Sequence, residues 1–272
     1  GDVMSVAIPT VAAGATTSGI QITPVTAMAQ AIAKQMVGGM TDANIAAANT
    51  AMGSYFSVTD IVHVQPMNPL VQGSGANASQ DAQNYGMTLA AMSKYAQAQG
   101  MTSSSAMVTA LMNDATDGNM DGKAGSVLVP MGGMMNPTML PPAAGTTGMG
   151  AAMGAFMTSA QNKSGITTPA LTSKLMGSTG QVMGSGAGMT GTSVSGTGFN
   201  GQMTQATVTA YAINNGTSGA RIASVTTDGQ GNFTMPLGTY SGAVMLQLSG
   251  GNYIDAATGT AMIMGAGDLF DQ

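Results

Sequence analysis

The oxygen-bearing side chains in the segment NDATDGNMDG come closest to a metal-binding pattern. Asp117, Asn119 and Asp121 occupy alternate positions before Gly122, as in the first half of an EF-hand calcium loop, where the glycine permits a sharp turn. The frame has no glutamate at its twelfth position to act as a bidentate ligand, but Asp114 is close enough in sequence to contribute. Two interpretations stay open: a structural Ca²⁺ site that orders the end of a helix, and a turn without metal.

Methionine is the second residue type with possible metal chemistry, because 27 of the 272 residues are Met and none is Cys. One cluster lies in a Gly/Pro-rich segment: Met131, Met134, Met135 and Met139. Another has helical spacing: Met149, Met153 and Met157. Thioethers without competing thiolates suit Cu(I). Met is also an adaptable filler of cores and interfaces, and many of these residues stand where Leu would serve on an amphipathic face, so packing is the favoured interpretation.

Enzymatic chemistry has little material in this sequence. The single histidine, His63, lies between valines and is expected in the core or at its rim rather than as a ligand. No serine stands in a G-x-S-x-G setting, and the Gly-rich stretches lack the lysine of a phosphate-binding loop. The sequence therefore predicts a protein that is not an enzyme and requires no cofactor, with Ca²⁺ as an optional ligand.

The composition favours self-association. Only 6% of the residues are charged, against about a quarter in ordinary soluble domains, so the surface lacks the charge that keeps molecules apart. A net charge of −5 argues against a nucleic-acid partner, which requires Lys and Arg to replace phosphate counterions. No run of about 18 apolar residues exists, so no membrane span is expected.

Hydrophobic periodicity predicts an α+β fold with an N-terminal extended strand, five or six central helices, and a C-terminal antiparallel β-sandwich. At the N-terminus, Met4, Val6 and Ile8 alternate with small residues, which is typical of a strand. The predicted segments are a strand segment at 1–22, a helical domain at 23–176 with a Gly/Pro/Met-rich loop at 124–148, a linker at 177–198, and the β-sandwich at 199–272.

The C-terminal segment contains the strand ATVTAY (206–211), the turn TDGQGNF (227–233) and the stretch GGNYIDAATG (250–259). These residues resemble the carboxypeptidase-regulatory-like, or transthyretin-like, β-sandwich module of bacterial surface proteins. The helical half is similar to the region that follows this module in some bacterial lipoproteins, where a helix begins TPLT; here it begins Thr23-Pro24-Val25-Thr26. The resemblance implies an extracellular or cell-surface location and transfers no catalytic residues.

The order of the parts differs from that family pattern, in which the sandwich comes first and its last strand leads into the helices. Here the sandwich comes last and stops at GDLFDQ, whereas the chain begins GDVMSVAIP. The sandwich is therefore expected to lack its closing strand, and the N-terminal segment is expected to be that strand. A sandwich without a strand exposes unpaired backbone groups, which an extended segment can fill by strand addition.

Insertion of the N-terminal strand into the next copy would join subunits head to tail, and such heterologous contacts propagate as a filament unless they close a ring. The predicted donor residues are Val3, Met4, Val6, Ile8 and Val11. The predicted acceptor residues are Val208, Tyr211, Phe233, Val244, Leu246, Leu248, Ile263 and Leu269. The sequence thus predicts a structural subunit of an extracellular filament. Two alternatives stay open: a metal-binding cell-surface protein, and a monomeric adhesin or envelope fragment in which the strand completes its own chain's sandwich.

Overall fold

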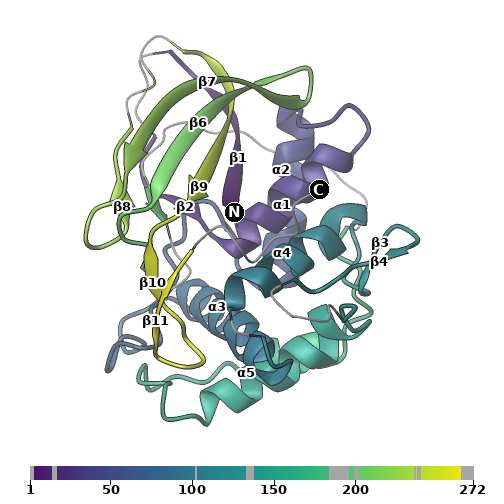
Figure 1. Ribbon diagram of the computed structural model, residues 1–272, viewed down its shortest axis with the longest axis vertical. Coiled ribbons are helices and arrows are strands. Elements are labelled where there is room, and N and C mark those ends of the chain that lie inside the picture. Colours follow the sequence, from purple (N-terminus) through teal and green to yellow (C-terminus); the bar gives the residue numbers. More distant parts are fainter. Residues whose placement is uncertain are drawn as a thin grey trace.

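The computed structural model describes residues 3–13, 17–101, 103–132, 138–183, 196–198, 202–235, 237 and 240–264. Within these ranges it contains six α-helices, a four-stranded antiparallel sheet and several small sheets (Figure 1). The predicted α+β class, the N-terminal strand and the number of helices are thereby confirmed.

All six described helices lie within residues 23–176, the range in which the sequence predicts five or six. They are α1 (Pro24–Gln35), α2 (Asp42–Tyr55), α3 (Gln80–Ala98), α4 (Ser104–Asp114), α5 (Met149–Met157) and α6 (Pro169–Met176). A capping box joins Thr23 and Thr26 at the start of α1, and Pro24 supplies a first helical residue that needs no N–H partner. The hydroxyl groups of Thr41 and Ser79 cap α2 and α3 by accepting the N–H groups of Asn44 and Ala82 respectively.

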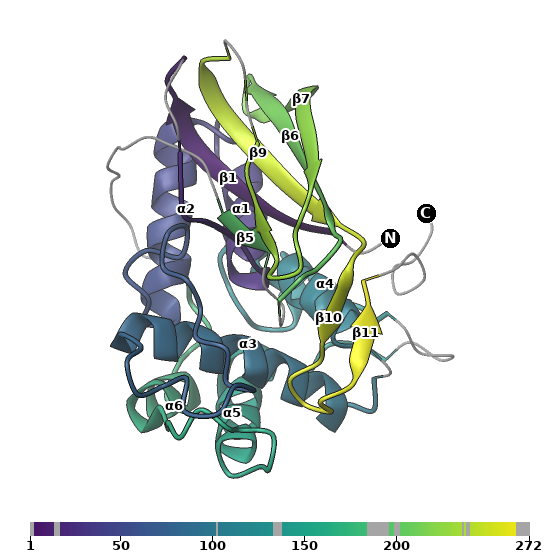
Figure 2. The same ribbon diagram turned by 90° about the vertical axis from the view of Figure 1, so that its left-hand side faces the viewer.

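The main sheet combines the two ends of the described chain. Its strand order is β1 (Val3–Val11), β9 (Gly242–Ser249), β6 (Thr207–Asn214) and β7 (Thr217–Thr226). Asn215 and Gly216 both have positive φ, which matches the turn that a tight β6–β7 hairpin requires. The sheet therefore has β1 at one edge and β7 at the other, with α1 and α2 on the β1 side (Figure 2).

Smaller sheets complete the β structure. One sheet joins β2 (Ile20–Ile22), β5 (Gly196–Gly198) and β8 (Asn232–Phe233); hairpins join β3 (Lys123–Ala124) to β4 (Val127–Leu128) and β10 (Asn252–Ile254) to β11 (Ala261–Ile263). A 3₁₀ turn, η1 (Ala115–Asp117), follows α4, and a π-helical turn, η2 (Ala144–Gly148), precedes α5. The β10–β11 hairpin lies at the α3 end of the molecule, away from the main sheet (Figures 1 and 2).

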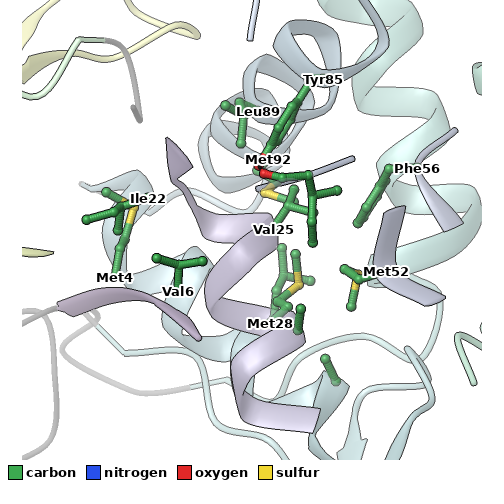
Figure 3. Close-up of a cluster of buried hydrophobic side chains, with 14 of the residues drawn as sticks. Met4, Val6, Ile22, Val25, Met28, Met52, Phe56, Tyr85, Leu89 and Met92 are labelled. Carbon is green, nitrogen blue, oxygen red and sulfur yellow. Dashed lines mark hydrogen bonds between the residues drawn. The ribbon is translucent and has the colours of Figure 1, made fainter. Parts of the chain in front are cut away.

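Buried side chains of the strands and the helices form one hydrophobic cluster. Figure 3 shows Met4 and Val6 of β1 facing Ile22, Val25 and Met28. The same cluster continues through Met52 and Phe56 of the α2 region to Tyr85, Leu89 and Met92 of α3. Strand β1 is thus part of the main core rather than an appendage to it.

Among the described helices, none combines the length and the apolar character needed to cross a membrane.

Candidate functional site

The predicted donor strand lies against the predicted acceptor residues, and both belong to one chain. Strand β1 pairs with β9 in an antiparallel register that places Met4 opposite Leu248, Val6 opposite Leu246 and Ile8 opposite Val244. All six side chains are at most 2% exposed. In the single chain, the N-terminal strand therefore completes its own sheet, which is the closure that the sequence left as an alternative to insertion into a neighbour.

The other predicted residues fall into three groups. Val3 and Val11 lie at the two ends of β1, and Val208 and Tyr211 lie on β6 next to β9. Two acceptor residues lie outside the main sheet: Phe233 is buried in β8 of the β2–β5–β8 sheet, and Ile263 of β11 is 70% exposed. Leu269 lies outside the described residues.

Helices α1 and α2 cover the outer edge of β1, the edge that faces away from β9. The Thr26 hydroxyl donates to the carbonyl of Ser5 at 3.0 Å, and the Asn49 side-chain amide donates to the carbonyl of Ala7 at 3.3 Å. Because an unpaired strand edge attracts other strands, these two bonds protect β1 on the side that β9 leaves open.

Two further contacts involve side chains of β1. The Ser5 hydroxyl donates to Gln30 Oε1 at 3.2 Å, and the Gln30 amide in turn lies 3.2 Å from the Met40 sulfur. The Thr10 N–H donates to Asp42 Oδ1 at 3.2 Å, and the Thr10 hydroxyl donates to Asp42 Oδ2. Strand β1 therefore occupies a slot with β9 on one side and polar helix side chains on the other.

Sequence reasoning did not find the helix side of this slot. Thr26 and Gln30 are four residues apart on α1, and Asn49 follows Asp42 by seven residues on α2, so each pair lies on one helix face. Thr26 and Gln30 are polar and buried, and buried polar groups require partners, but only the structure shows that these two side chains are buried.

The acidic segment after α4 forms a set of backbone turns. Asp114 is fully buried, and its Oδ1 accepts the N–H groups of Gly122 at 2.6 Å and Lys123 at 3.0 Å. The Asp117 carboxylate accepts from the N–H groups of Asn119 at 2.9 Å and of Gly125 at 2.7 Å. Burial raises the pKa of Asp114 to about 7, and Asp114 Oδ2 has no hydrogen-bond partner.

Asp121 takes part in the same turns, since it accepts the N–H of Lys123 at 3.1 Å. No group of three or more His, Cys, Asp or Glu side chains suited to a metal occurs within the described ranges. These contacts fit the interpretation of a turn without metal, in which carboxylates accept backbone N–H groups. Ca²⁺ binding by Asp117, Asn119 and Asp121 stays a prediction.

Methionine sulfurs in the helical cluster lie inside the protein. Met149 and Met153 are fully buried. The Thr168 hydroxyl lies 3.4 Å from the Met153 sulfur, and the Thr168 N–H lies 3.0 Å from the Met157 sulfur. These contacts fit a packing role for the helical cluster.

The loop cluster is divided between interior and surface. Met131 is 2% exposed and Met139 is 48% exposed, so the two differ strongly in their access to a metal ion in solution. Met134 and Met135 lie outside the described residues. Copper binding by this cluster stays a prediction.

His63 lies at the rim of the core, where its Nδ1 is 2.7 Å from Asp60 Oδ2 and both side chains are nearly half exposed. The hydrogen bond that the Asp60 carboxylate accepts from the His63 ring raises the pKa of His63. Among the described residues, His63 and Asp60 are not part of any group of three or more side chains that could bind a metal ion.

Comparison with known proteins found no matching family model, no matching curated protein and no matching solved structure. The resemblance to a carboxypeptidase-regulatory-like module, and the cell-surface location that it implies, therefore stay predictions.

Proposed function

We propose that this protein is the structural subunit of an extracellular filament, in which copies join head to tail by exchanging strand β1. The observation that carries the proposal is the pairing of β1 with β9, with three apolar residues of one strand opposite three of the other. Each contact that β1 makes within its own chain is available, with the same chemistry, to β1 of a neighbour. Exchange of an identical element is a low-cost route to assembly for this reason.

The position of β1 favours exchange. It is an edge strand, so its departure breaks one ladder, whereas departure of β9 or β6 would break two. It is also the first described element, and only residues 12–19 connect it to β2. A neighbour's β1 would restore the ladder and cover the apolar residues that departure exposes.

The low charge of the chain supports the same proposal. With 6 basic and 11 acidic residues among 272, electrostatic repulsion between copies is weak. Because the donated strand and the accepting slot are different surfaces, each added copy leaves one of each free, and the contact repeats along an axis.

The pairing within one chain specifically favours one alternative, a monomeric envelope protein or adhesin whose N-terminal strand stays in its own sheet. The two functions make different predictions about which chain supplies β1. A test must therefore distinguish a strand donated by the same chain from one donated by another.

Two single-cysteine chains make this distinction because the protein contains no native cysteine. Val3 and Ser249 are directly opposite each other and half-buried. Val3→Cys chains and Ser249→Cys chains are refolded together at high concentration, oxidised, and separated on a denaturing gel without reductant. Exchange predicts a Val3→Cys/Ser249→Cys heterodimer, and the double variant in one chain predicts a ladder of covalent multimers.

The matched control mixes Val3→Cys with Thr217→Cys, since Thr217 is exposed on the opposite edge of the same sheet. This pair should give no more heterodimer than random collision. If the double variant yields only an internally linked monomer, and the mixed chains yield no heterodimer above the control, β1 stays in its own chain and the filament proposal is wrong. Electron microscopy of the same samples shows whether linked chains form fibres.

A further inference from the structure

The apolar pattern of β1 does not by itself define one register. A slip of one residue turns Met4, Val6 and Ile8 to the wrong face, so alternation excludes it. A slip of two residues in one direction still fills the buried face without a charge, because Val6, Ile8 and Thr10 would take the places of Met4, Val6 and Ile8. The opposite slip would put Asp2 in the place of Met4, so the apolar pattern already excludes it. This inference rests on the proposed function, in which the strand comes from another copy. For such a strand, some feature other than the apolar pattern must exclude the first of these two-residue slips.

The hydrogen bonds from Thr26 and Asn49 do not exclude it. Both side chains donate to backbone carbonyls, of Ser5 and Ala7 respectively. Every residue of an inserted strand carries a carbonyl, and those two residues apart point to the same side. These bonds therefore hold a strand in the slot without identifying its register.

The contacts of Gln30 and Asp42 depend on register because they reach side-chain hydroxyls. Gln30 Oε1 accepts from the Ser5 hydroxyl, and the residues two positions away, Val3 and Ala7, have no such donor. Gln30 is only 8% exposed, so a slipped strand would leave its Oε1 without a partner in the interior.

The second contact works in the same way at the other end of β1. Asp42 accepts both the N–H and the hydroxyl of Thr10. The residues two positions from Thr10 are Ile8 and Ala12, which offer no hydroxyl group. A two-residue slip in either direction therefore loses both side-chain contacts together.

We propose that Gln30 and Asp42 are positioning residues that set the register of the strand in the slot. The partner that the slot fits is the 3–11 segment of a second copy of this chain, an extended segment with alternating apolar residues and with hydroxyls at Ser5 and Thr10. Gln30 and Asp42 come from two different helices, so the register depends on the packing of α1 and α2 against the sheet.

Cysteine pairs report the register directly. In the native register Val3 is opposite Ser249, whereas Ala7 is opposite Met245 and has Gln247 only as a diagonal neighbour on the same face. Directly opposite residues without mutual hydrogen bonds have Cα atoms about 4.5 Å apart, whereas diagonal neighbours are about 7–8 Å apart, beyond the reach of a strain-free disulfide. The full chain carrying Val3→Cys with Ser249→Cys measures the native register in a glutathione buffer, and the chain carrying Ala7→Cys with Gln247→Cys measures the slipped register.

The test compares these two reporters with and without Ser5→Ala and Thr10→Val, which remove both hydroxyls and keep the strand apolar and similar in size. The ratio of 7–247 to 3–249 disulfide should increase about tenfold or more, as expected for the loss of two hydrogen bonds. Ser218→Ala with Thr226→Val on exposed positions of β7 is the matched control and should leave the ratio unchanged.

An unchanged ratio in the Ser5→Ala/Thr10→Val chain overturns the assignment of Gln30 and Asp42. Formation of the 3–249 disulfide in that chain shows that the fold is retained. Failure of this inference can be told apart from failure of the filament proposal, because the ratio measures register. The size of the linked product measures whether one chain or two supplied the cysteines.

Discussion

At the scale of single residues, Asp114 shows how burial changes the behaviour of a side chain. Its carboxyl group is fully buried. One oxygen, Oδ1, accepts hydrogen bonds from two backbone N–H groups, and the other oxygen, Oδ2, has no hydrogen-bond partner. Burial, with a smaller contribution from the nearby Asp121, raises its pKa to about 7. The protonated form is therefore favoured in the folded chain far above the pH at which an exposed aspartate ionises.

This shift predicts that stability decreases as pH rises. The folded chain holds a proton that the unfolded chain releases near pH 4, so the contribution of Asp114 is complete below about pH 4 and is lost as pH rises to about 7. One proton limits the slope to about 1.4 kcal/mol per pH unit. Asp114→Asn should flatten the pH dependence of the unfolding free energy over this window, as measured by urea titration at pH 5 and pH 7.5. An equally steep dependence in the variant contradicts the prediction.

At the scale of elements, a contact between two turns joins the β6–β7 hairpin to the helices. The N–H of Met40, between α1 and α2, donates to the carbonyl of Gly216 at 2.8 Å. A Cβ added to Gly216 would lie 2.3 Å from the carbonyl oxygen of Gly38, and one added to Gly39 would lie 2.6 Å from the carbonyl oxygen of Gly216. Two backbones approach here more closely than any side chain allows, so glycine is required on both sides.

Gly216→Ala should accordingly destabilise the protein more than backbone strain alone explains. The matched control is Gly100→Ala, because Gly100 has a similar positive φ but open space around its Cβ position. The control should cost about 1–2 kcal/mol, the penalty for an alanine in the left-handed region. Gly216→Ala should cost clearly more in the same denaturation experiment, since the two turns must separate. Equal costs would show that the contact between the turns adds nothing.

At the scale of the whole molecule, β1 links the first residues of the chain to the C-terminal strands and to the helices. It pairs with β9, packs on α1 and accepts hydrogen bonds from α1 and α2. If assembly proceeds by exchange of β1, free copies of this segment should compete for the slot at the growing end. The protein then behaves as a chain that carries both the ligand and its binding site.

A synthetic peptide of residues 1–11, added in excess during refolding, should therefore shorten the filaments. The same peptide with Val6→Asp is the control, because Val6 is fully buried opposite Leu246 and a carboxylate there would lose its hydration. Mean fibre length in negative-stain electron micrographs is the measurement. Fibres of the same length with both peptides, or fibres formed by chains lacking residues 1–10, would exclude exchange of β1.

The sequence by itself determined the elements of this fold and part of the site. Capping residues, Pro24 and the helical spacing of apolar residues predicted five or six helices, of which the described part of the chain has six, and alternation identified β1 and the strands of the C-terminal part. The same alternation selected Met4, Val6 and Ile8 as residues that pair with Val244, Leu246 and Leu248. Local patterns carry this information because the helical and extended backbones impose their own periods on the side chains.

Only the tertiary structure decided which contacts form between elements that are distant in the sequence. Periodicity does not reveal that Thr26, Gln30, Asp42 and Asn49 cover the outer edge of β1, because hydrogen bonds between side chains and a distant strand depend on how helices pack on the sheet. It does not reveal the contact between Gly38, Gly39 and Gly216 either. Nor does it show that β1 completes its own sheet, since a strand's pattern specifies the face and the partner residues but not the chain that supplies them.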